Sequence, residues 1–145
     1  MTVVRMTRLA LGWLTLISLQ LGIWALFAPR SFYDDFPGLG RTWVSVDGPF
    51  NEHLVRDVGA LNLALVLLFV AAAWRGSRDL VVVAGGAAIL WGLPHFLYHL
   101  VNTEGLAAGD AAASLTGLAV YVAAGAVLVW TGRTIESTTA LQEID

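Results

Sequence analysis

Residues 80–101 read LVVVAGGAAILWGLPHFLYHLV, and this stretch decides the fold. It contains no Asp, Glu, Lys or Arg, and roughly 20 apolar residues are enough for one helix to cross a bilayer. Its two histidines, His95 and His99, stand four residues apart, so on a helix they share one face, one turn apart. The stretch therefore predicts a membrane-spanning helix that carries a pair of imidazoles near one end.

Three further apolar runs of similar length cover residues 9–28, 53–74 and 111–131. The 145-residue chain is 57% hydrophobic and only 13% charged, whereas a soluble domain is nearer half apolar and a quarter charged. None of the runs shows the alternation of a barrel strand. We therefore predict an all-α fold, a four-helix transmembrane bundle over residues 1–133. The polar tail, residues 134–145, is expected to be disordered.

The arginines predict the orientation of this bundle. Basic residues in short flanks favour the cytoplasmic side, and a cytoplasmic N-terminus places five arginines inside and three outside. Both termini are then cytoplasmic. The inside set is Arg5, Arg8, Arg75, Arg78 and Arg133, and the outside set is Arg30, Arg41 and Arg56.

The connection between the first two spans, residues 29–50, is then extracytoplasmic. Pro29, Pro37 and Pro49 prevent a continuous helix and mark turns. Its aromatic residues make it too apolar for a free loop. We expect either a lid over the outer mouth of the bundle or a connector lying among the headgroups.

Ionisable residues gather near the outer ends of three spans. His53 and Asp57 stand one turn apart at the start of the second span, and His95 and His99 at the end of the third. In an antiparallel pair His53 is level with His99, and Asp57 with His95. Asp110 adds a carboxylate at the start of the fourth span. Ionisable groups inside a membrane are costly and mark functional sites.

Three imidazoles with one or two carboxylates are ligands suited to zinc, iron or copper. The leading hypothesis is a membrane metalloprotein whose site is formed by His53, Asp57, His95, His99 and Asp110. Asp57 would be a ligand or the general base in a reaction on a lipophilic substrate entering from the bilayer. The zinc-protease helix also needs a Glu after its first His, and Phe96 stands there instead.

Alternatives stay open at this point. His53 with His95 or His99 could be the axial ligands of a b-type haem. The same polar cluster could instead hold the helices together in a non-catalytic accessory or lipid-binding subunit. Glycine-rich helix faces, at Gly85, Gly117 and Gly125, fit helix packing or a homo-oligomer. Cysteine is absent and no basic tract is present, which excludes thiol chemistry and gives no indication of nucleic-acid binding.

The layout resembles that of the DoxX-like proteins, small four-span membrane proteins of bacteria. The resemblance rests on the Arg-flanked first span, the Phe27-Ala28-Pro29 exit with Phe32-Tyr33 after it, and Asp57-Val58-Gly59 in the second span. It covers nearly the whole chain and implies a four-span protein of the bacterial cytoplasmic membrane. The histidine set is not part of this resemblance.

Overall fold

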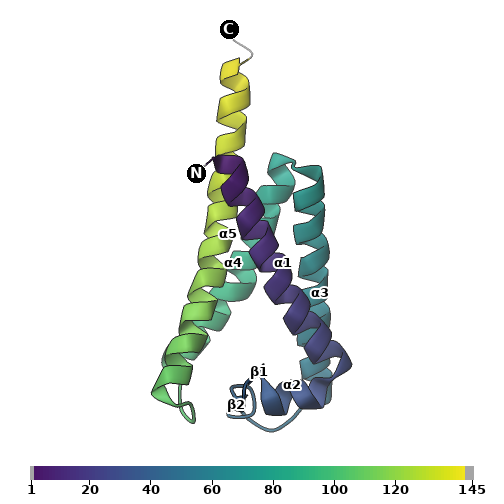
Figure 1. Cartoon of the computed structure of the whole chain (residues 1–145), viewed down its shortest axis with the longest axis vertical. Coiled ribbons are helices and arrows are strands. Elements are labelled where there is room, and N and C mark those ends of the chain that lie inside the picture. Colours follow the sequence, from purple (N-terminus) through teal and green to yellow (C-terminus); the bar gives the residue numbers. More distant parts are fainter. Residues whose placement is uncertain (1, 143–145) are drawn as a thin grey trace.

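The protein is a bundle of helices with one very short strand pair (Figure 1). This structure is a computed structural model that describes residues 2–142, with side chains described up to residue 134. Four helices are long and apolar enough to cross a membrane, the fourth over residues 108–134, so the predicted spans are confirmed. The elements are, in order, α1 (Val3–Phe27), α2 (Pro29–Asp35), β1 (Pro37–Gly38), β2 (Arg41–Thr42), α3 (Glu52–Arg75), α4 (Arg78–Val101) and α5 (Ala108–Gln142).

Local signals explain where the spans begin and end. The Asn51 side chain accepts a hydrogen bond from the backbone N–H of Leu54 at 3.1 Å and so caps the start of α3. Gly76 ends α3 in the left-handed conformation, with φ of 62°, which glycine adopts without steric cost. Residues 76–77 then connect α3 to α4 directly, so these two helices are antiparallel, as the sequence predicts.

The bundle consists of two closely packed helix pairs. Helix α1 packs mainly against α3, and α4 mainly against α5. Glycines allow the approach: a methyl group added at Gly59 would lie 2.5 Å from the backbone nitrogen of Leu26, and one at Gly85 would lie 2.6 Å from the carbonyl oxygen of Gly125. Gly85 and Gly125 are thus used within the chain, and the homo-oligomer expected from the glycine-rich faces stays a prediction.

The connection between α1 and α3 closes one end of the bundle. We call this end, formed by α2, the β1–β2 hairpin and residues 102–107, the loop end; the opposite end, with the α3–α4 turn and the start of α1, is the turn end (Figure 1). Phe32 of α2 is buried, and its ring centroid lies 5.8 Å from that of Trp24 on α1. The connection therefore packs onto the bundle as a structured cover.

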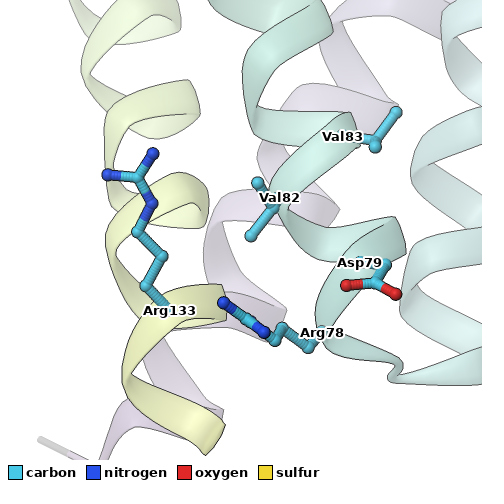
Figure 2. A pocket seen from close by; sticks show the side chains of 5 residues that line it. All are labelled: Arg78, Asp79, Val82, Val83 and Arg133. Carbon is cyan, nitrogen blue, oxygen red and sulfur yellow. The ribbon is translucent and has the colours of Figure 1, made fainter.

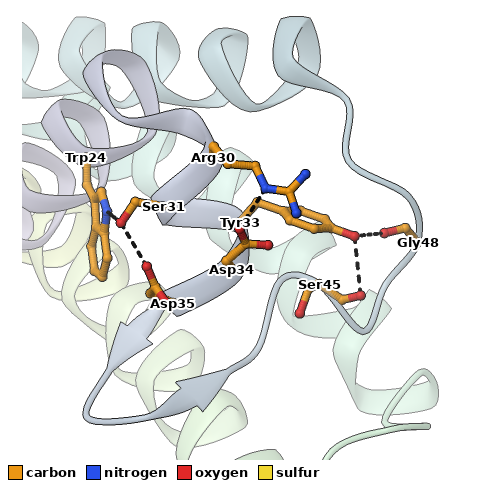
Figure 3. Close-up of polar contacts among 8 residues, drawn as sticks. All are labelled: Trp24, Arg30, Ser31, Tyr33, Asp34, Asp35, Ser45 and Gly48. Carbon is orange, nitrogen blue, oxygen red and sulfur yellow. Dashed lines mark hydrogen bonds and ion pairs between the residues drawn. The ribbon is translucent and has the colours of Figure 1, made fainter.

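Polar contacts hold α2 in place (Figure 3). The indole N–H of Trp24 donates to Ser31 at 3.2 Å, and the Ser31 hydroxyl donates to Asp35 at 2.9 Å. Arg30 pairs with Asp34 at 2.6 Å, and this hydrogen bond raises the pKa of Arg30 above its ordinary value. The Tyr33 hydroxyl donates to the carbonyl oxygen of Gly48 at 2.5 Å, which ties the end of the connection back to α2.

The polar tail continues the last helix. Helix α5 extends to Gln142, so the backbone of residues 134–142 is helical, and residues 143–145 lie outside the described part of the chain. The expected disorder of this tail stays a prediction.

Candidate binding cavity at the loop end

A cavity of about 510 Å³ lies at the loop end of the bundle. Its volume falls within the range of small-molecule sites, about 300–1,000 Å³. All four long helices and the α1–α3 connection contribute to its wall. Most of the lining is apolar, with an aromatic share made up of Trp13, Phe32, Phe36, Trp43, Trp91 and Tyr121.

His95 and His99 bring polar atoms to this cavity from α4. Trp91, His95 and His99 follow each other at four-residue intervals, so they form one helical face, and all three line the cavity. The Nε2 atoms of the two imidazoles lie 3.1 Å apart and share one hydrogen bond. The predicted pair is thus placed together, on the inner side of its helix.

Asp47, from the α1–α3 connection, completes the polar group. Its Oδ2 atom lies 4.0 Å from Nε2 of His99, and its side chain also lines the cavity. The side chains of His99 and Asp47 are 12% and 35% exposed, so both are partly removed from solvent. We call Asp47, His95 and His99 the polar cluster.

Two buried atoms beside the cavity have no hydrogen-bond partner among the residues that the structure describes. They are Nδ1 of His99 and Oδ1 of Asn62. The amide nitrogen of Asn62 donates to the carbonyl oxygen of Val58 at 2.9 Å, which leaves its oxygen as the unpaired atom. Buried polar groups are nearly always hydrogen-bonded in folded proteins. Both atoms are almost without accessible surface, so they lie behind the cavity wall and do not open onto the cavity.

His53 and Asp57 lie away from this cavity. The α3 residues that line it are Leu54, Val55, Val58 and Asn62. His53 precedes Asn62 by nine residues, and at about 100° per residue the two lie on opposite sides of the helix. His53 and Asp57 pair with each other at 3.3 Å, with side chains 87% and 61% exposed.

Asp110 serves as an anchor for the hairpin. Its carboxylate forms an ion pair with Arg41 on β2 and accepts a hydrogen bond from the indole N–H of Trp43 at 2.9 Å. These contacts fix the strand pair to the first turn of α5. Trp43 in turn lines the cavity. Asp110 therefore influences the cavity indirectly, by holding in place the hairpin that covers it.

The five sequence-predicted site residues therefore occupy three separate places. His95 and His99 are at the cavity, His53 and Asp57 on the outer side of α3, and Asp110 at the hairpin. Within residues 2–134, no three His, Asp or Glu side chains are grouped closely enough to hold a metal ion. Asp47, Asn62 and the aromatic wall are additional candidates that the spacing of the histidines did not indicate.

The fold and the cavity define a class: an all-helical membrane protein with four spans and an apolar cavity at one end. No family model matches the sequence, and neither a curated protein nor a solved structure is similar to it.

Proposed function

We propose that this protein binds a lipophilic small molecule in the loop-end cavity. The carrying observation is the composition of the cavity wall, which is mostly apolar, includes several aromatic side chains and has the polar cluster in one region. Such a wall fits an amphipathic molecule whose apolar part lies against the tryptophans and whose polar group lies beside His99 and Asp47. A few polar groups in an apolar pocket fix the orientation of a ligand.

This proposal keeps one part of the metalloprotein hypothesis, the lipophilic molecule, and does not require the metal. Binding is the step that the geometry supports most directly, because it needs only the cavity and its polar cluster. Chemistry on the bound molecule would use His95, His99 or Asp47 as acid or base, since these side chains line the cavity and Asp57 does not. The resemblance described above favours the membrane of a bacterial cell, and the arginine distribution favours an orientation with the loop end outside.

Filling the cavity tests the proposal. Gly117 lines the cavity, and a methyl group added there meets no described atom within 4 Å. Gly117→Leu therefore fills space without displacing the helices. Gly86→Leu is the matched control, because Gly86 is equally open but does not line the cavity.

The measurement is the uptake of radiolabelled 4-nonylphenol by nanodiscs that contain the protein, corrected for uptake by empty discs. We expect saturable excess uptake of one molecule per protein in the wild type and in Gly86→Leu, and its loss in Gly117→Leu. Excess uptake that is absent from the wild type, or unchanged in Gly117→Leu, would argue against a ligand cavity.

A transition metal at His95 and His99 is the second candidate function. Two nitrogen ligands of one tetrahedral zinc ion lie about 3.3 Å apart, because each Zn–N bond is about 2.0–2.1 Å. The 3.1 Å between the two Nε2 atoms is close to this value. Asp47, the nearest carboxylate of the polar cluster, is 4.0 Å from His99, so it would have to move to become a third ligand.

Elemental analysis of the purified protein tests this second candidate. The metal proposal predicts about one equivalent of metal, lost in His95→Ala/His99→Ala and retained in His53→Ala, whose imidazole lies outside the cavity. Equal metal content in the wild type and in both variants would contradict the metal proposal. An absorption spectrum of the same sample tests the haem alternative, which predicts a Soret band.

A further inference from the structure

A second hollow lies at the turn end, far from the loop-end cavity along the bundle. It is lined by Arg78, Asp79, Val82, Val83 and Arg133. In Figure 2 the Arg78 side chain extends from α4 toward α5, the Arg133 side chain runs along its own helix α5, and Arg78 lies between Arg133 and Asp79 in this view. We call it the arginine hollow. It combines two guanidinium groups from different helices with an apolar floor of valines.

Close packing of the two helices brings these arginines together. Arg78 is the first residue of α4, and Arg133 lies on α5 two residues after the predicted apolar run 111–131. A methyl group added at Gly132 would lie 2.7 Å from a side-chain carbon of Val82, so α4 and α5 are in direct contact at this level. Arg133 follows Gly132 directly and Arg78 precedes Val82 by four residues, so the two arginines lie within about one helical turn of each other along the bundle.

The level of these two arginines along the bundle corresponds to the edge of the apolar region. Both arginines stand at ends of spans, where the chain leaves hydrocarbon for headgroups. Trp74 and Trp130 lie at ends of neighbouring spans with 86% and 53% of their surface exposed, which is the position of an interfacial aromatic belt. A phosphate group of the bilayer would thus lie level with the arginine hollow.

Charge complementarity indicates the ligand. The start of α1, the α3–α4 turn and the end of the fourth span carry Arg5, Arg8, Arg75, Arg78 and Arg133, five of the eight arginines. Guanidinium groups bind phosphate through paired hydrogen bonds. Basic pockets between transmembrane helices are known sites for the headgroups of anionic lipids. The two valines offer an apolar surface for the upper part of the acyl chains.

We propose that the arginine hollow is a binding site for one anionic phospholipid, whose phosphate is held between Arg78 and Arg133. The site depends on the membrane placement of the helices and is independent of the loop-end cavity. The Asp79 carboxylate repels a negative headgroup and therefore limits the selectivity for anionic lipids. With two arginines and one aspartate, the net charge of the hollow is +1. Lipids with a zwitterionic headgroup bind more weakly because their positive group faces the guanidiniums.

Native mass spectrometry of the full chain in detergent tests this site. The protein is offered equal amounts of dioleoyl phosphatidylglycerol and dioleoyl phosphatidylcholine, which share acyl chains and differ only in headgroup. For the singly lipid-bound protein we expect roughly a fivefold preference for phosphatidylglycerol. In Arg78→Gln/Arg133→Gln the preference falls to about one, whereas Arg75→Gln, which removes a charge at the same end but outside the hollow, keeps it.

Two further measurements make the outcome decisive. Unchanged helical circular dichroism and unchanged binding of phosphatidylcholine show that the double variant is folded. In Arg78→Lys/Arg133→Lys, which keeps the charge but loses the planar fork, we expect an intermediate preference. The proposal is overturned if the wild type shows no preference, if the double Gln variant keeps it, or if Arg75→Gln abolishes it to the same extent.

Discussion

His99 is the residue on which the binding proposal depends most. Its Nε2 lies between the imidazole of His95 at 3.1 Å and the carboxylate of Asp47 at 4.0 Å, and its Nδ1 has no partner in the described part of the chain. Because the His99 side chain lines the cavity, its ring offers a polar contact to a bound molecule. The polar group of a ligand is therefore expected to contact this ring.

Replacing His99 by Leu should weaken the binding of polar ligands selectively. Loss of one hydrogen bond to a buried ligand lowers affinity by roughly tenfold. We expect His99→Leu to reduce the affinity of the nanodisc-embedded protein for 4-nonylphenol by that factor and to leave its affinity for nonylbenzene unchanged. Equal losses for both probes would mean that the substitution changes the shape of the cavity rather than its chemistry.

The sequence predicts part of this site and misses part of it for a geometric reason. The four-residue spacing correctly places His95 and His99 on one face. The depth argument for His53 and Asp57 considers only the height of a residue along the helix, and height does not determine the direction of a side chain. The spacing of Val55, Val58 and Asn62 was the available signal for the inner face of α3. Asp47 could not be placed because it belongs to an irregular connection.

At the scale of elements, close helix packing depends on glycines, and Gly85 is an example. A methyl group at Gly85 would collide with the backbone of α5, 2.6 Å from the carbonyl oxygen of Gly125. Backbone cannot move aside as a flexible side chain can, so α4 and α5 would have to separate. Gly86, the next residue, has no described atom within 4 Å of such a group.

Gly85→Ala should therefore destabilise the protein by about 1–3 kcal/mol, the usual effect of overpacking. Gly86→Ala should be neutral or slightly stabilising, because alanine favours the helix. Thermal unfolding in detergent, followed by circular dichroism, compares the two variants. Equal melting temperatures would show that α4 and α5 are not packed as closely as described.

The hairpin and its anchor form the second element with a testable role. Asp110 holds Arg41 and Trp43 to the start of α5. In Asp110→Ala we expect the amide protons of residues 37–43 to exchange with deuterium faster, because the cover loses its polar contacts. Mass spectrometry of proteolytic fragments measures this exchange. His53→Ala is the control, and exchange that is equally fast in both variants would contradict the anchoring role.

At the scale of the whole molecule, the four spans follow directly from the length and hydropathy of the sequence. Their bounds in the structure differ from the predicted runs by a few residues because caps and solvated turns extend the helices beyond the apolar segments. Helix α2 lies in the predicted lid, where the prolines indicated turns but gave no sign of seven helical residues starting at Pro29. The orientation in the membrane is a separate prediction.

The absence of cysteine makes this orientation measurable. Leu39 in the hairpin is fully exposed, and Ser77 in the α3–α4 turn is exposed as well. In intact cells we expect a membrane-impermeant maleimide to label Leu39→Cys but not Ser77→Cys, because the arginine distribution places the turn end inside. Permeabilised cells provide the positive control. The reverse labelling pattern would mean that the turn end lies outside and the loop end inside.

The most direct test of the binding proposal is to locate a ligand by anomalous diffraction. Crystals grown in a lipid phase with a 4-nonylphenol analogue that carries a terminal bromine would mark the position of its apolar end. We predict one bromine peak inside the loop-end cavity, with the phenol oxygen of the same molecule near His99 and Asp47. Bromine peaks confined to the lipid-facing surfaces, with a cavity that contains only water, would contradict the proposed function.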